Sequence, residues 1–158
     1  MTVTIREADG NDFEAVGAIF FEELQFHADL LPARFRLAEP IMTLAWYEEI
    51  LQNPEKVLLV AEENGRILGQ VLLNISKTPD DPIIKPRKFV YVDEIGVTAS
   101  HRGQGIGKQL MAAAKEWAQA QGIAEIELNV WEQNGRAIGF YEKLGYQTVR
   151  RRMWIRVD

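Results

Sequence analysis

The chain contains no cysteine, few histidines and no long apolar run, and each absence excludes a class of protein. Because no cysteine occurs among the 158 residues, neither a disulfide bond nor a thiolate nucleophile can form. The two histidines, His27 and His101, are too few for a histidine-rich metal site, so we expect no metal. No apolar run approaches the roughly 18 residues of a membrane span. The N-terminus lacks the apolar region of a signal peptide, so we expect a cytoplasmic protein without membrane contact.

Positive charge is also scarce, with 18 basic against 23 acidic residues and a formal net charge of −5. A nucleic-acid-binding domain is normally basic, so we expect no nucleic-acid partner. The acidic balance mildly favours a cationic partner such as an amine. The length fits a single domain spanning residues 1–158, which is long enough to bury a core without covalent staples.

The most informative stretch is residues 90–121, which predicts a strand, a glycine-rich turn and an amphipathic helix. Gly103, Gly105 and Gly107 alternate, so no Cβ blocks a ligand from approaching the backbone there. Apolar residues then recur at helical spacing from Ile106 onward. The N-terminus of a helix presents free N–H groups and a positive dipole end, and it therefore suits a phosphate. Lys108 adds positive charge at the same place.

Two familiar phosphate-binding motifs do not fit this turn. The pattern G-x-x-x-x-G-K-[ST] needs glycine where Arg102 stands and Ser or Thr where Gln109 stands. The pattern G-x-G-x-x-G, started at Gly103, needs glycine where Lys108 stands. The pattern that fits is R-x-x-G-x-G, formed by Arg102, Gly105 and Gly107. Between an apolar strand and an amphipathic helix, it resembles the acyl-CoA loop of the GCN5-related N-acetyltransferases (GNAT).

A second motif runs from Leu128 to Tyr146 and reads L-N-V-W-E-Q-N-G-R-A-I-G-F-Y-E-K-L-G-Y. An apolar strand, an Asn and then A-x-x-F-Y-x-K-x-G-Y resemble the other signature of the same family. The resemblance covers residues 90–146. It implies an α/β (α+β) fold with a mixed, mostly antiparallel central sheet flanked by helices on both faces. It further implies an acetyl-CoA-dependent N-acetyltransferase acting on the amine of a small molecule or protein, and it allows a homodimer.

Patterns outside the two motifs agree with that order of elements. Alternation, capping and turn residues predict strands at 2–6, 57–62, 66–76, 88–97 and 123–130 and helices at 12–25, 41–52, 105–121 and 137–144. Pro40 suits the first turn of the second helix, and Asn64-Gly65 indicates a tight hairpin. Tyr146–Val157 predicts a final strand. We expect its arginines, Arg150 to Arg152, to be solvated; contact with the ribose phosphate of the cofactor is the less favoured alternative.

The resemblance implies a role for individual residues. Ile95, Gly96 and Val97 correspond to the strand end whose backbone pairs with pantetheine. Asn134 corresponds to the residue that contacts the cofactor arm, and Tyr141 to the tyrosine near the thioester sulfur. The loop around the pyrophosphate corresponds to Arg102, Gly103, Gln104, Gly105, Ile106, Gly107 and Lys108.

The chemistry of amine acetylation identifies further candidates. An alkylamine has a pKa near that of lysine, about 10.4, so a base assists its attack on a thioester. Asp93 and Glu94 are the only acids inside an apolar strand, and they are the candidate bases. Because neighbouring residues of a strand point to opposite faces, we expect only one to reach the acceptor. Tyr141 can protonate the leaving thiolate. His27 is a weaker candidate base, since a lone histidine at a helix end is more often structural.

Two other readings stay open from the sequence. The chain is alternatively a non-catalytic acyl-CoA-binding sensor or regulatory module, or it binds another nucleotide through the same glycine loop. The sequence identifies neither the acceptor amine nor the length of the acyl group. We expect the residues that select the acceptor to lie in 20–47 and 77–87.

Overall fold

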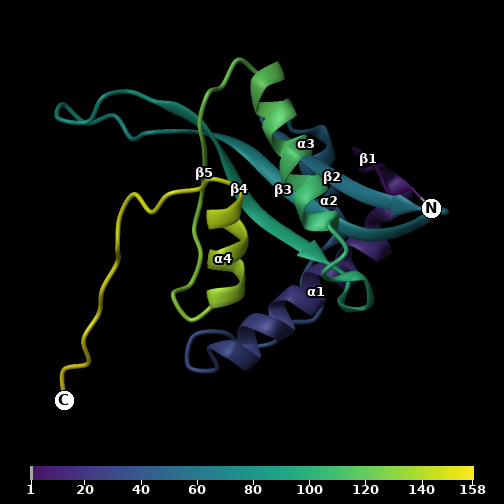
Figure 1. The fold of residues 1–158 in the computed structure, drawn as a ribbon, viewed down its shortest axis with the longest axis horizontal. Helices are drawn as coiled ribbons and strands as arrows, with labels where there is room; N and C mark the ends of the chain where they lie inside the picture. The colour runs from purple at the N-terminus through teal and green to yellow at the C-terminus, as the bar shows by residue number, and fades with distance from the viewer. Residues whose placement is uncertain (1) are drawn as a thin grey trace.

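A computed structural model describes residues 2–158. One five-stranded sheet has its strands in chain order, and only β4 and β5 run parallel (Figure 1). The strands are β1 (Thr4–Glu7), β2 (Lys56–Glu63), β3 (Arg66–Lys77), β4 (Lys88–Val97) and β5 (Ile126–Leu128). The helices are α1 (Phe13–Leu30), α2 (Leu44–Gln52), α3 (Ile106–Ala120) and α4 (Gly135–Lys143), with short 3-10 turns at Gly10–Asp12 and Ala99–His101. This mixed, mostly antiparallel sheet with helices on both faces confirms the predicted fold class.

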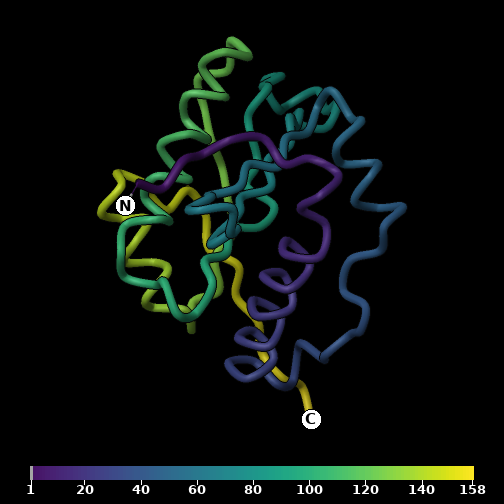
Figure 2. Tube along the Cα trace, turned by 90° about the vertical axis from the view of Figure 1, so that its right-hand side faces the viewer, coloured from purple at the N-terminus to yellow at the C-terminus, as the bar shows by residue number. Residues whose placement is uncertain are grey.

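Two hydrophobic clusters lie on opposite faces of the sheet. Leu58 and Val60 of β2 pack with α1 and α2, whereas Leu59 and Ala61 pack with α3. This alternation follows from the two-residue period of a strand, which directs successive side chains to opposite faces. Figure 2 shows the consequence, with α1 and the chain leading to α2 on one side and α3 and α4 on the other. No helix among residues 2–158 is long and apolar enough to span a bilayer.

The meander from β2 to β4 is predicted correctly, including its tight turn. Asn64 and Gly65 both have positive φ, 51° and 75°, which is the backbone that a type I′ hairpin requires. The strand-helix-strand unit formed by β4, α3 and β5 is parallel as expected. Gly122, with φ of 69°, follows the end of α3 at the predicted position.

Three predicted boundaries are wrong. α1 continues to Leu30, because Pro32 restricts only the residue before it, and Leu31 accordingly leaves the helix with φ of −133°. α2 begins at Leu44 rather than beside Pro40, since the Thr43 hydroxyl accepts a hydrogen bond from the Trp46 amide at 3.2 Å and caps the helix there. β5 contains three residues rather than eight.

The predicted final strand over Tyr146–Val157 is also wrong in this structure. Residues 147–158 have no regular secondary structure and are exposed. Figure 1 shows this segment leaving the end of α4 and running away from the sheet. A strand is defined by its ladder of hydrogen bonds to a neighbour. The alternating pattern is therefore present, but the segment lies beside no strand of its own chain.

Candidate active site

The carboxyl end of β4 separates from β5. The two strands pair at three positions, ending at Val92 opposite Leu128, whereas β4 continues to pair with β3 as far as Val97. Within residues 2–158, Ile95, Gly96 and Val97 therefore have a strand neighbour on one side only. An unpaired strand side presents backbone donors and acceptors to an extended ligand. This geometry suits the pantetheine contact that we predict for these three residues.

The three glycines of the following loop differ in their structural roles. Gly103 and Gly105 have φ of 75° and 84°, a backbone region that other residues rarely adopt. Gly107 has an ordinary φ, but a Cβ at this position would lie 3.3 Å from Cζ of Phe140. Gly107 therefore allows α4 to pack closely against the first turn of α3.

The first turn of α3 is open to an anion. Gly105 is the N-cap residue and offers no side chain, so among residues 2–158 the first turn has no side-chain cap. Ile106 is buried in the core, and only its backbone can contribute to such a site. Gln104 and Lys108 are exposed beside it. The turn thus combines free amides, the positive end of a helix dipole and one cationic side chain.

Arg102 lies against α1. Its Nε donates to the Val97 carbonyl oxygen at 3.0 Å, and one terminal nitrogen donates to Glu23 at 3.3 Å. The neighbouring Glu22 accepts a hydrogen bond from the Ala99 amide at 2.9 Å. Glu22 and Glu23 therefore hold the segment between β4 and α3 against α1. The sequence reasoning missed both residues, because on a helix they look like ordinary solvent-facing acids.

Asp93 is the extra residue of a β-bulge. Leu72 pairs with Glu94 and Leu73 with Val92, so the pairing skips Asp93. Before the bulge, the even positions Val90 and Val92 face α3. After it, the odd positions Ile95 and Val97 face α3, so the bulge shifts the alternation of β4 by one residue. A bulge re-aims side chains in this way and is common beside active sites.

The bulge overturns the expectation that Asp93 and Glu94 point to opposite faces. Both line the same hollow of about 340 Å³ on the α1 and α2 side of the sheet. Aromatic and polar side chains complete its wall, and the amide nitrogen of Asn74 donates to Asp93. The other lining residues are Phe20, Trp46, Lys56, Leu72 and Asn74. The hollow contains two carboxylates and two aromatic rings, a combination that suits an ammonium or amine group.

Glu94 has the most perturbed carboxyl group of the site. Burial and, to a smaller extent, the nearby negative charges of Glu23 and Asp93 together raise its pKa to about 8. Burial also raises the pKa of Glu23, although the positive charge of Arg102 opposes that shift. Cγ of Glu23 would lie 2.8 Å from a Cβ on Gly96, so α1 packs directly on the end of β4. This close approach explains why residue 96 is glycine.

Tyr141 lies on α4 and faces the same carboxylates. Burial raises the pKa of its phenol above the usual value, and the negative charges of Glu94 and Glu23 act in the same direction. Its ring contacts Phe140 and Tyr146, with centroids 5.2 and 5.6 Å apart. Its hydroxyl has no hydrogen-bond partner among residues 2–158. The phenol therefore stays protonated near neutral pH and retains a free donor.

The remaining predicted residues have structural partners. The Asn134 side-chain oxygen accepts from the Ala137 amide at 3.1 Å and caps α4, which leaves its amide nitrogen for a ligand. His27 Nδ1 lies 2.8 Å from the Glu23 carbonyl oxygen, and its ring packs between Phe26 and Phe35. This structural position agrees with the lower weight given to His27 as a base.

Sequence and structure comparisons decide the family. The sequence model of the Acetyltransferase (GNAT) family matches residues 21–146, most of the chain. The chain belongs to the GNAT family of acetyltransferases. This GNAT chain is 28% identical over 148 residues to an uncharacterized N-acetyltransferase, YhfO, of Bacillus subtilis, covering 92% of the chain and 90% of that protein. It is 31% identical over 144 residues to an acetyltransferase of Yersinia pestis, covering 91% and 87%.

Solved structures extend the similarity to the whole fold. A mutant of the BH1408 protein from Bacillus halodurans matches with a TM-score of 0.92 and 28% identity, covering 98% of the GNAT chain and 99% of that protein. The aminoglycoside acetyltransferase AAC(6')-Iy, in complex with a bisubstrate analogue of coenzyme A and acetylneamine, matches with a TM-score of 0.76. At 22% identity over 100% of this chain and 99% of that one, this second similarity shows the fold alone.

Proposed function

We propose that the chain transfers an acetyl group from acetyl-CoA to a primary amine by direct attack within a ternary complex. The observation that supports this most strongly is the meeting of three features at the end of β4. These are the open first turn of α3, the protonated phenol of Tyr141 and the carboxyl group of Glu94 with its raised pKa. Direct attack requires no covalent enzyme intermediate, and this agrees with a chain that has no cysteine nucleophile.

The loop and the strand end are proposed to bind the donor. The first-turn amides of α3 and Lys108 hold the diphosphate, since a helix N-terminus favours negative charge. The unpaired side of residues 95–97 holds the pantetheine arm through backbone hydrogen bonds. AAC(6')-Iy has been crystallised with coenzyme A, and this supports the same donor class for a chain of the same fold. The arrangement directs the thioester toward Tyr141.

Glu94 is proposed as the base and Tyr141 as the acid. The Glu94 carboxylate takes a proton from the incoming ammonium, and the neutral nitrogen attacks the thioester carbonyl carbon. The new C–N bond gives a tetrahedral oxyanion, which collapses as the C–S bond breaks and sulfur leaves with its electron pair. Tyr141 donates its proton to that sulfur, and the nitrogen releases its remaining extra proton through solvent to the Tyr141 phenolate. Backbone N–H groups at the separated strand end stabilise the oxyanion that develops between these steps.

The hollow beside Glu94 is proposed to bind the acceptor. Asp93, Glu94 and Glu23 place negative charge around it, and the positive charges of Lys56, Arg102 and Arg136 offset that charge in part. Phe20 and Trp46, whose rings make an edge contact at 5.9 Å, provide an apolar wall. These features favour a cationic amine carried on a partly apolar body.

Release of coenzyme A in the presence of an amine panel tests the proposal. The chain has no cysteine, so a thiol reagent reports only the product thiol. We expect thiol release that requires both acetyl-CoA and an amine. Tight acetyl-CoA binding without turnover on any amine would instead support the non-catalytic module.

Gly105→Ala provides a matched test of the donor loop. At φ of 84° the substitution strains the backbone that presents the amides. We expect KM for acetyl-CoA to rise about tenfold, which corresponds to about 1.4 kcal/mol. Gly65→Ala is the control, because Gly65 has φ of 75° and equal open space but lies in the β2–β3 hairpin. An equal KM for both variants and the unmodified protein would exclude the loop as the donor site.

A further inference from the structure

Gln70 of β3 is a fully buried polar side chain that the proposed mechanism does not use. It is 0% exposed, yet neither the nitrogen nor the oxygen of its side-chain amide has a hydrogen-bond partner in the described part of the chain, residues 2–158. Burying an amide without a partner destabilises a fold, so native proteins rarely keep one. An apolar side chain of the same length would carry no such cost. The unpaired amide therefore indicates a partner that it meets in another state of the site.

Gln70 lies on the same face of the sheet as the proposed acceptor hollow. It pairs with Val60 on β2 and with Gly96 on β4, and directly opposite residues of neighbouring strands point to the same face. Val60 packs with α1 and α2. Leu72, two residues further along β3, lines the hollow. The amide is therefore buried beside the hollow, on the side of the sheet that α1 covers.

Two carboxyl groups flank this amide. Glu94 pairs with Leu72, so it lies diagonally across from Gln70 on the same face. Diagonal neighbours of this kind are about 7–8 Å apart, a separation that two long side chains can bridge. Glu23 covers Gly96, since a Cβ on Gly96 would lie 2.8 Å from Cγ of Glu23. Because residue 96 is glycine, β4 places no side chain between the amide and the two carboxyl groups.

An amide suits a carboxyl group that gains and loses a proton. Its N–H donates to a carboxylate, and its C=O accepts from a protonated carboxyl group. A carboxyl group that acts as a base passes through both forms in each turnover. We infer that Gln70 is a positioning residue, whose amide hydrogen-bonds the Glu94 carboxyl group while the acceptor occupies the hollow and so holds that group toward the amine. The inference rests on the proposed acetyl transfer, with Glu94 as its base.

The groups around Glu94 set the sign of the expected pH effect. Other titratable and charged side chains act on Glu94, on its neighbour Glu23 or within the same hollow, and they are His27, Lys56, Asp93, Arg102, Arg136 and Tyr141. All of them stay in place when Gln70 alone is replaced. A hydrogen bond to a charged acceptor is about twice as strong as one to a neutral acceptor, so the amide favours the ionised form of Glu94. Its removal should therefore raise the pKa of the Glu94 carboxyl group.

Gln70→Met tests the inference, because methionine keeps the length of the side chain and removes both amide atoms. We expect kcat for an alkylamine to fall about tenfold with KM for acetyl-CoA unchanged, since a misplaced base slows proton transfer. The pH profile of kcat reports groups in the complex with the acceptor bound. Its midpoint should rise by about one pH unit relative to the unmodified protein.

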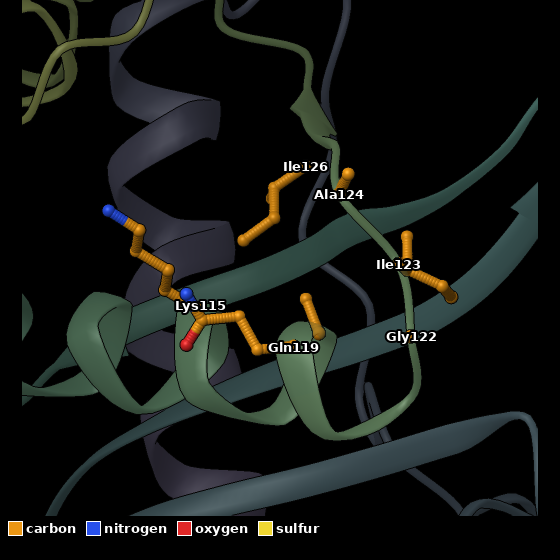
Figure 3. Close-up of a pocket in the computed structure, with 7 residues that line it drawn as sticks. Lys115, Gln119, Gly122, Ile123, Ala124 and Ile126 are labelled. Atoms are coloured by element: carbon orange, nitrogen blue, oxygen red, sulfur yellow. The ribbon is translucent and has the colours of Figure 1, made fainter.

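Two controls make comparable changes elsewhere. Leu73→Met alters an equally buried position of β3 that faces α3 instead of α1. Gln119→Met makes the identical substitution on α3, beside a hollow of about 380 Å³ between that helix and the chain that leads into β5 (Figure 3). Both variants should keep the kcat and the pH midpoint of the unmodified protein.

Each other outcome overturns the inference for a different reason. An unchanged kcat and midpoint in Gln70→Met would exclude the positioning role and leave the proposed acetyl transfer intact. A lower kcat with an unchanged midpoint, matched in Leu73→Met, would show an effect of packing alone. If the unmodified protein releases no coenzyme A with any amine, the proposed function fails and the inference fails with it. A carbon-13 titration of the Glu94 carboxyl group, with the alkylamine bound and acetyl-CoA absent, reads the pairing without turnover, and an equal pKa in Gln70→Met and the unmodified protein would refute it.

Discussion

Two clusters of charged residues on this chain behave in opposite ways. In the first, Arg6 donates to both carboxylate oxygens of Asp12 at 2.7 and 3.0 Å and to Glu62 at 2.6 Å. The hydrogen bonds from Arg6 to Asp12 lower the pKa of the Asp12 carboxyl group. In the second, Glu23 and Glu94 lie near Tyr141, and burial raises the pKa of all three groups. We refer to these as the Arg6 cluster and the Glu94 cluster.

The ionised carboxylate of the Arg6 cluster stabilises the fold, whereas ionisation of the Glu94 cluster destabilises it. The lowered pKa of Asp12 means that its contribution to stability is present above the ordinary carboxyl pKa and is lost as the pH falls through its lower folded value. The raised pKa of Glu94 has the opposite consequence, because stability falls as the pH rises from the ordinary value toward about 8. A charge that the fold disfavours is typical of a functional site.

Glu94→Gln should produce the largest effect. Loss of the base should reduce kcat by about 100-fold or more, with acetyl-CoA binding unchanged. The same variant should unfold at a temperature a few degrees higher at pH 9, because an uncharged amide replaces a buried carboxylate. Steady-state kinetics and thermal unfolding measure the two effects. Asp93→Asn is the control for kinetics, and an equal loss in both variants would contradict a specific role for Glu94.

Arg6→Met should affect stability alone. It leaves the buried carboxylate of Asp12 without its main partner, and we expect a loss of about 2 kcal/mol, or about 4–8 °C in unfolding temperature. The kinetic constants of the folded variant should not change. Lys56→Met is the stability control, since it breaks the more exposed pair with Glu49 and should cost clearly less than Arg6→Met. Equal losses would remove the distinction between the two types of pair.

Tyr141→Phe should have a smaller effect that is confined to catalysis. Removing the phenolic proton should reduce kcat about tenfold with little change in KM for acetyl-CoA. Tyr146→Phe is the matched control, because its ring lies 5.6 Å from Tyr141 and is likewise partly buried. An unchanged kcat for Tyr141→Phe would exclude its role as the acid.

Gln70→Met tests a buried polar group outside both clusters. Gln70 lies on β3 opposite Gly96, is 0% exposed, and neither of its amide atoms has a hydrogen-bond partner among residues 2–158. Replacing an unpaired buried amide by an apolar side chain of similar shape should leave stability unchanged or raise it by up to about 1 kcal/mol. Chemical denaturation measures the change, and a clear loss would show that the amide is satisfied in solution.

The sequence predicts the proposed donor side of the site better than the proposed acceptor side. Gly103, Gly105 and Lys108 follow one another in a local motif, so short-range pattern is sufficient to place them around the start of α3. Glu23 comes close to Glu94 only because α1 packs on Gly96, and that contact joins residues more than 70 positions apart. No local pattern carries this information.

Two further predictions from the sequence are wrong, and each has an equally specific structural cause. Strict alternation assigns Asp93 and Glu94 to opposite faces, and a single bulged residue is enough to reverse that assignment. The tail residues 147–158 have the alternation of a strand, but a pattern does not say which strand lies beside it. The overall order of elements was predictable, because hydrophobic period and turn residues are local properties.

The pH dependence of kcat/KM for an alkylamine tests the central claim about Glu94 most directly. If Glu94 takes the proton from the ammonium, the rate of the unmodified protein should rise to about pH 8 and then level off. In Glu94→Gln the rate should continue to rise toward the pKa of the amine itself, about 10.4 for a lysine-like amine. Profiles of the same shape for both proteins would contradict the account.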